Sequence, residues 1–201
     1  ILINGMEYIS TRNTEKTYLF NDVFLRGLAP DGGLFVPRRF PKFEFEELNE
    51  LKNISYNKLA TKILLKYCSE YSEKEIQKLI ENSYKNFRVN ETVSVKKIGK
   101  ISLLELFHGP TLAFKDIAMQ VIGNMYETIL KKKKLDINVV VATSGDTGAA
   151  AINAIKDKKY LKIFVLHPEN RISEIQRKFM TTVNSKNVFN IALEGNFDEC
   201  Q

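Results

Sequence analysis

Cysteine is scarce in this sequence, and the two cysteines present do not form a recognisable kind of site. Cys68 and Cys200 lie far apart, without a CxxC pair or the spacing of metal ligands. The sequence therefore excludes a framework of several disulfides and a cysteine-based metal centre. So little cysteine is typical of a protein from a reducing compartment.

Long apolar runs are absent as well. No stretch of about 18 apolar residues occurs, which is the length at which a membrane-spanning helix becomes a candidate. The sequence also shows no segment in which positive charges precede a short apolar run, the pattern of a secretory signal. We therefore expect a cytoplasmic protein without a membrane partner.

The positive charge is not concentrated in one place. The 201 residues include 30 lysines and arginines against 24 acidic residues, for a net charge of +6, and both signs are spread through the chain. Nucleic-acid binding calls for basic residues gathered on one face, so we expect no nucleic-acid partner. The clearest basic run, Lys131 to Lys134, follows a helical pattern. We interpret it as a solvated helix end that the helix dipole favours, with a binding patch as the alternative.

The first part of the chain has mainly helical patterns. Apolar residues recur at helical spacing from Thr17 to Leu28, and again from Phe43 to Phe87, where we expect two or three helices. Ser72 and Glu75 have the spacing of a capping box at a helix start. Together with a short extended stretch around Tyr8, these patterns predict an α+β domain.

Alternating apolar and polar residues between Val93 and Ile98 predict a strand. A turn at Gly99 and Lys100 then leads to a second strand, Ile101 to Phe107, so this segment is predicted to be a hairpin. The change of pattern places a domain boundary near residue 90. The expected domains are residues 1–90 and residues 91–201.

Helices and buried strands alternate in the rest of the chain. The expected order is β-α-β-α-β, which builds a parallel sheet with ligands at the carboxyl ends of its strands. The fold class predicted is α/β, with the α+β domain followed by the start of a parallel-sheet lobe. The predicted elements are a helix from Asp116 to Ile129, strands at 137–142, 161–166 and 188–193, and a helix at 172–182. An alanine-rich helix is also predicted, which opens from the turn Thr143 to Gly148 and reaches about Asp157.

The segment Phe107 to Asp116 places one lysine, Lys115, between an aromatic residue and an acid at the entrance to a helix. A lysine forms a Schiff base only as the neutral amine, and both burial among apolar groups and a nearby positive helix end favour that form. The alternative is a lysine that reaches solvent at a helix start, beside a favourable first-turn acid, Asp116. The residues by themselves leave both interpretations open.

A second segment, Ala142 to Ala150, joins a buried strand to a helix through two glycines and several hydroxyls. Backbone amides at a helix start attract a carboxylate or phosphate, and glycine lets a ligand approach closely. The alternative is an ordinary turn in which Thr143, Ser144 or Asp146 caps the helix. The segment has neither the ending of a P-loop nor the GxGxxG of a dinucleotide fold.

Taken together, these segments resemble one family. HGPTLAFKD (108–116) followed by ATSGDTGAA (142–150) is similar to threonine synthase, a pyridoxal-phosphate (PLP) enzyme of fold type II. GLAPDGGLFVP (27–37) resembles the amino-terminal domain of that family, and RISEIQRKFMTT (171–182) and GNFDECQ (195–201) resemble later stretches. The resemblance covers nearly the whole chain in the right order, and it identifies the chain as the amino-terminal part of such an enzyme.

The resemblance implies roles for individual residues. Lys115 matches the lysine that carries PLP and later moves protons on the substrate. Four residues, Ser144, Gly145, Asp146 and Thr147, match the loop that holds the substrate carboxylate and lies near the cofactor. Asp146 stands where many fold-type-II enzymes have asparagine. His108 and Thr111 match the loop before the lysine, where a contact with the substrate phosphate or a supporting role is implied; a packed, hydrogen-bonded His108 is the alternative.

The reaction implied is the conversion of O-phospho-L-homoserine and water into L-threonine and phosphate, with PLP as the cofactor. The alternatives are a threonine or serine dehydratase-like lyase, against which GLAPDGGLFVP argues, and a noncatalytic threonine-synthase-like binding protein, against which Lys115 argues. In this family, the loop that cradles the PLP phosphate lies later in the chain. Because the sheet would be left with three strands and an open edge, we expect a truncated lobe and an incomplete, inactive fragment.

Overall fold

The computed structural model describes residues 5–201, which divide between Glu81 and Asn82 into two compact units. The first unit combines a short antiparallel strand pair with helices, as the predicted α+β domain requires. The domain boundary near residue 90 stays a prediction. The elements of the first unit are β1 (Tyr8–Ser10), α1 (Phe20–Arg26), β2 (Phe35–Pro37), α2 (Phe45–Glu50), α3 (Tyr56–Tyr67) and the start of α4 (Glu73–Tyr84).

Helix α1 is shorter than the sequence pattern predicts. Tyr18 bridges to Tyr8 through two backbone hydrogen bonds of 3.0 and 2.9 Å, and Leu28 bridges to Leu34. These bridges hold both ends of the predicted helical segment in extended backbone. The capping box of α4 is confirmed, because the Ser72 backbone N–H donates to Glu75 and the Glu75 N–H donates to the Ser72 hydroxyl.

The second unit contains a hairpin and a parallel sheet. Strands β3 and β4 pair antiparallel around Gly99, whose φ of +60° suits the predicted turn. The three later strands pair in the order β5-β6-β7, all parallel, which confirms the predicted topology. The elements are β3 (Ser94–Ile98), β4 (Ile101–Glu105), α5 (Asp116–Lys133), β5 (Ile137–Ala142), α6 (Asp146–Ile155), β6 (Leu161–Pro168), α7 (Glu174–Thr181), β7 (Val188–Leu193) and α8 (Phe197–Cys200).

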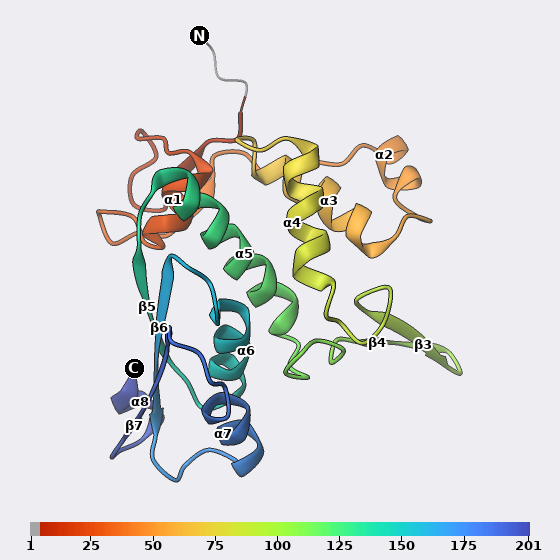
Figure 1. Ribbon diagram of the computed structural model, residues 1–201. Helices are drawn as coiled ribbons and strands as arrows, with labels where there is room; N and C mark the ends of the chain where they lie inside the picture. The colour runs from red at the N-terminus through yellow and green to blue at the C-terminus, as the bar shows by residue number, and fades with distance from the viewer. Residues whose placement is uncertain (1–4) are drawn as a thin grey trace. The chain divides into compact units, whose positions relative to one another are not determined.

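Helices α5, α6 and α7 lie on one side of this sheet (Figure 1). The alanine-rich α6 is almost wholly buried, because small side chains let it pack closely against its neighbours. Ile163 and Val165 of β6 are fully buried beneath these helices, whereas the residues that alternate with them, Phe164 and Leu166, are not. The carboxyl ends of β5, β6 and β7 lie at one edge of the sheet, so the loops that follow them share a rim.

The basic run Lys131 to Lys134 closes α5 as predicted. Lys131, Lys132 and Lys133 occupy the last turn of the helix, and Lys134 follows in a left-handed conformation. All four side chains are exposed, which agrees with a solvated helix end. Among the residues described, no helix is long and apolar enough to cross a membrane.

Candidate active site

Lys115 lies at the amino-terminal cap of α5, immediately before the first helical residue. Its side chain is 28% exposed, and its ammonium nitrogen lies 4.7 Å from the centre of the Phe114 ring. The apolar surroundings expected for this lysine are therefore only partly present. The Lys115 side chain is partly open to solvent, and its amine lies over the Phe114 ring.

The closest polar partner of Lys115 comes from the turn after β5. Its Nζ donates a hydrogen bond of 2.8 Å to Oδ2 of Asp146, which is 38% exposed and stands 31 residues later in the chain. This hydrogen bond from Lys115 is the main reason that the pKa of Asp146 lies below its ordinary value. The two segments singled out in the sequence thus meet through their charged residues.

The helix cap at this turn is supplied by Thr143. Its buried hydroxyl oxygen accepts hydrogen bonds from the backbone N–H groups of Gly145 (3.0 Å) and Gly148 (2.8 Å). Two of the amides left unsatisfied at a helix start are thereby paired. Of the three residues that the sequence offered as a cap, Thr143 accepts two of these amides. Asp146 accepts the Thr147 N–H, through Oδ1 at 2.9 Å, and its Oδ2 contacts Lys115.

Several hydrogen-bond donors of the same turn remain available. Within residues 5–201, no acceptor is found for the backbone N–H of Ser144 or Asp146, and the hydroxyls of Ser144 and Thr147 have no hydrogen-bond partner. They stand at the positive end of α6, a helix of 10 residues. Such a set of donors is suited to a carboxylate or another small anion.

Gly145 is required at this turn for two reasons. Its φ of +142° is rarely adopted by residues with a side chain, and a Cβ atom there would lie 2.4 Å from Oε1 of Gln176. The Gln176 side chain of α7 thus fills the volume that a side chain at position 145 would take, and no room for a ligand is left on this side of Gly145. The sequence analysis did not single out Gln176, because its contact with Gly145 depends on how α7 packs.

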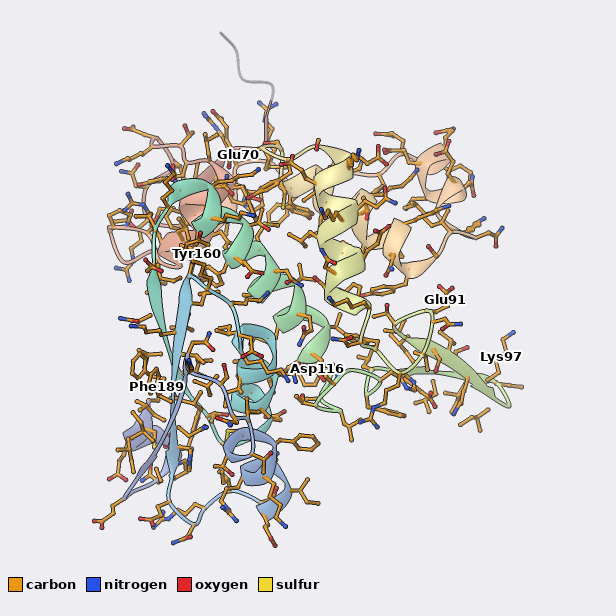
Figure 2. The ribbon with its side chains drawn as sticks, viewed as in Figure 1. Glu70, Glu91, Lys97, Asp116, Tyr160 and Phe189 are labelled. Carbon is orange, nitrogen blue, oxygen red and sulfur yellow. The ribbon has the colours of Figure 1, made fainter. Side chains whose placement is uncertain are left out.

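The predicted site residues His108 and Thr111 make other contacts. His108 Nε2 lies 3.0 Å from Oε2 of Glu105 and 3.2 Å from the Ser94 hydroxyl, so it is the packed, hydrogen-bonded histidine of the alternative interpretation. Thr111 donates from both its backbone and its hydroxyl to Asp116, which is buried at the start of α5 (Figure 2). Contact of either residue with a substrate stays a prediction.

In sum, the structure brings Lys115 and Asp146 into direct contact. It places Ser144, Gly145 and Thr147 in the same turn as Asp146. Among residues 5–201, no group of three or more histidine, cysteine, aspartate or glutamate side chains is placed to hold a metal ion. The chemistry available at this position is that of an amine, a carboxylate and an anion-binding turn.

Comparison with known proteins supports the family suggested by these segments. Residues 7–84 match the family described as "Threonine synthase N terminus". The chain is 42% identical to a threonine synthase of Pseudomonas aeruginosa over 198 residues and 41% identical to that of Saccharomyces cerevisiae over 211 residues. The chain is similar to the amino-terminal part of threonine synthases. The two matches include 98% and 96% of this chain, but this chain spans only 42% and 41% of the length of the two relatives.

Solved threonine synthase structures agree with the fold. A PLP-bound threonine synthase from Brucella melitensis aligns with a TM-score of 0.92 at 38% identity, and the threonine synthase of Escherichia coli aligns with 0.84 at 30%. These alignments cover 98% of this chain, and 43% and 44% of the other two chains. The α/β fold class predicted from the sequence is therefore confirmed.

Proposed function

We propose that this chain carries the cofactor lysine and the substrate-carboxylate turn of a PLP-dependent threonine synthase. The reaction proposed for the whole protein converts O-phospho-L-homoserine and water into L-threonine and phosphate, and the location proposed for it is the cytoplasm. The observation that carries this proposal is the contact between Lys115 and Asp146, beside unpaired donors at the start of α6. The match of residues 7–84 to the threonine synthase amino terminus favours this reaction over that of a dehydratase-like lyase.

The residues present fit PLP and an amino-acid substrate. Lys115 supplies a partly exposed primary amine, which is the group that a carbonyl cofactor requires. The amides of Ser144 and Asp146 and the hydroxyls of Ser144 and Thr147 supply donors for a carboxylate. When bound, PLP supplies the electron sink for bonds broken at the substrate carbons.

The chain's own residues then have distinct tasks. The turn Ser144 to Thr147 binds and orients the carboxylate of the substrate, which fixes the direction of the adjacent Cα–H bond. Lys115 Nζ receives the proton from that carbon, and the Asp146 carboxylate at 2.8 Å stabilises the resulting ammonium group. Because the Thr143 hydroxyl accepts the N–H groups of Gly145 and Gly148, the Asp146 carboxylate is not needed for those two amides and can make this contact.

Substitution of Lys115 tests this assignment. The complete protein encoded by the gene is incubated with PLP, reduced with borohydride and digested, and the labelled peptide is identified by mass spectrometry. We expect the label on Lys115 and its loss in Lys115→Ala, together with the loss of phosphate release from O-phospho-L-homoserine.

Lys162→Ala is the matched control, because Lys162 is an exposed lysine of β6. It is expected to keep both the label and the activity of the unaltered protein. A folded Lys115→Ala protein that retains the same reduced PLP label would contradict the assignment.

A further inference from the structure

Asp116 is the most completely buried acid among the residues described, although it follows Lys115 directly. It is 0% exposed and occupies the first turn of α5, where an acid would ordinarily face solvent. A buried carboxylate needs hydrogen-bond donors to offset the loss of water. Asp116 finds two of them in Thr111.

Thr111 binds both oxygens of this carboxylate. Its backbone N–H donates to Oδ2 at 2.8 Å, and its hydroxyl donates to Oδ1 at 2.7 Å. Burial raises the pKa of Asp116, and the two hydrogen bonds from Thr111 act in the opposite direction. The pair ties the loop that begins at His108 to the first turn of α5.

Gly109 makes room for this arrangement. A Cβ atom at that position would lie 2.4 Å from Cβ of Asp116 and 2.5 Å from its Oδ2. No side chain fits there without moving Asp116. The glycine, the threonine and the aspartate therefore form one unit, which we name the Asp116 clasp.

The loop enclosed by the clasp contains a strained residue. Leu112 has a φ of +63°, a left-handed conformation that is unfavourable for any residue with a Cβ atom, and its side chain is exposed. Such conformations persist where the surrounding contacts determine them. Lys115 lies three residues later, between this strained turn and Asp116, so its backbone is fixed from both sides.

We propose that Asp116 is a positioning residue, which through Thr111 and Gly109 holds the Lys115 amine in reach of Asp146. This inference rests on the proposed function only in naming Lys115 as the cofactor lysine. The clasp acts on the lysine itself, whether or not PLP is bound. It also gives a role to Thr111, whose hydroxyl donates to Asp116.

Three variants of the complete protein test the clasp. Thr111→Val removes the hydroxyl at nearly unchanged volume, and Thr111→Ser retains it. Thr128→Val is the matched control, because Thr128 also donates a hydroxyl hydrogen bond within α5, to the Asn124 carbonyl at 2.8 Å, far along the helix from Lys115. Thermal unfolding shows that each variant is folded before the lysine is assayed.

The first measurement uses no cofactor. Each protein is treated briefly with trace acetic anhydride, and acetylation of Lys115 is quantified by mass spectrometry relative to the exposed Lys162. In Thr111→Val we expect Lys115 to react between about twofold and fivefold faster, the range that loss of a partly exposed ion pair implies. Thr111→Ser and Thr128→Val are expected to keep the rate of the unaltered protein.

An unchanged rate in folded Thr111→Val, or an equal increase in Thr128→Val, would overturn the proposal. If Thr111→Val does not fold, Asp116→Asn replaces it, and the same increase is expected because the amide cannot accept both Thr111 donors. The second measurement is the fraction of PLP that borohydride fixes on Lys115, expected to fall at least about threefold in Thr111→Val. The unaltered protein could take up no PLP while Lys115 is still acetylated faster in Thr111→Val than in the unaltered protein and Thr128→Val. In that case the proposed function fails, and the positioning role of Asp116 stands.

Discussion

At the scale of single residues, Asp146 shows how one hydroxyl determines the role of a neighbouring acid. Aspartate in the first turn of a helix often serves as its cap. Here Thr143 accepts the two backbone hydrogen bonds, and Asp146 Oδ2 contacts Lys115. The sequence offered both residues as caps, and it could not choose between them because the choice depends on side-chain rotamers in a buried turn.

Asp146→Asn separates the two roles, because asparagine caps a helix about as well as aspartate. We expect the melting temperature to remain close to that of the unaltered protein. Turnover should fall at least about tenfold, equivalent to about 1.4 kcal/mol in the activation barrier, because the amide does not stabilise a protonated Lys115. Steady-state release of phosphate from O-phospho-L-homoserine by the complete protein measures this effect.

Asp136→Asn is the matched control, since Asp136 is exposed and makes no hydrogen bond among the residues described. It should leave both turnover and melting temperature unchanged. Equal turnover in Asp146→Asn and the unaltered protein would show that the ion pair with Lys115 has no part in the reaction.

At the scale of secondary structure, the start of α6 depends on Thr143. Its hydroxyl is buried, so replacement by valine leaves the Gly145 and Gly148 amides without their acceptor. We expect Thr143→Val to lower the free energy of unfolding by about 1–2 kcal/mol, the usual cost of losing a threonine cap. Urea denaturation measures this loss.

Thr143→Ser keeps the oxygen and should lose less stability than the valine variant. Thr147→Val serves as the control at the same turn, because the Thr147 hydroxyl has no partner among the residues described. If Thr147→Val were as destabilising as Thr143→Val, the cap assignment would be wrong.

The hairpin of β3 and β4 is held at its base by Glu105, whose side chain is only 6% exposed. Hydrogen bonds from Lys96, Ser94 and His108 lower its pKa to about 2 from an ordinary 4.5. Because the folded-state pKa is the lower one, this stabilisation is complete above about pH 4.5 and is lost as the pH falls toward 2. Acid should therefore reduce the stability that Glu105 gives to the β3–β4 hairpin.

We predict that Glu105→Gln is less stable than the unaltered protein at pH 6 and that the difference narrows as the pH is lowered to about 3. Melting temperatures measured across this range provide the test. Glu169→Gln, at an exposed glutamate with no described side-chain hydrogen bond, should show no such narrowing. A difference that stays constant down to pH 3 would contradict the assignment of these hydrogen bonds to the ionised carboxylate.

At the scale of the second unit as a whole, one face of the parallel sheet carries exposed apolar side chains. Val140, Phe164 and Phe189 lie in register across β5, β6 and β7, and the Phe164 and Phe189 rings stack at 4.8 Å. Val140 is 66% exposed, and Phe189 points away from α6 (Figure 2). Parallel sheets are ordinarily covered on both faces, so this face is expected to associate with other apolar surfaces.

We therefore predict that residues 1–201, produced as a separate polypeptide, self-associate at micromolar concentrations. Val140→Lys should reduce this association in sedimentation velocity measurements, because it places a charge beside Phe164 on the exposed apolar face. Lys162→Glu, which alters a charge already exposed on β6, is the control and should not. A monomeric separate polypeptide would show that the face is covered by other means.

The sequence by itself determined the order and type of the elements in the second unit, including the bounds of β5 and β7. Those signals are local: an apolar run of six residues and a helical repeat need no knowledge of distant neighbours. It also placed Lys115 at a helix start and the glycine turn at the carboxyl edge of the sheet. The shortening of α1 was not predictable in this way, because Tyr18 and Tyr8 pair through backbone atoms that no side-chain pattern encodes.

Only the tertiary structure decided how the site residues are used. The contact of Lys115 with Asp146 spans 31 positions, and so does the packing of Gln176 against Gly145; both depend on how helices settle onto the sheet. Asp116 looked like an ordinary first-turn acid because sequence spacing does not reveal burial. Its role follows from Gly109 and Thr111 closing over it, since a carboxylate removed from water must take its hydrogen bonds from the nearest protein donors.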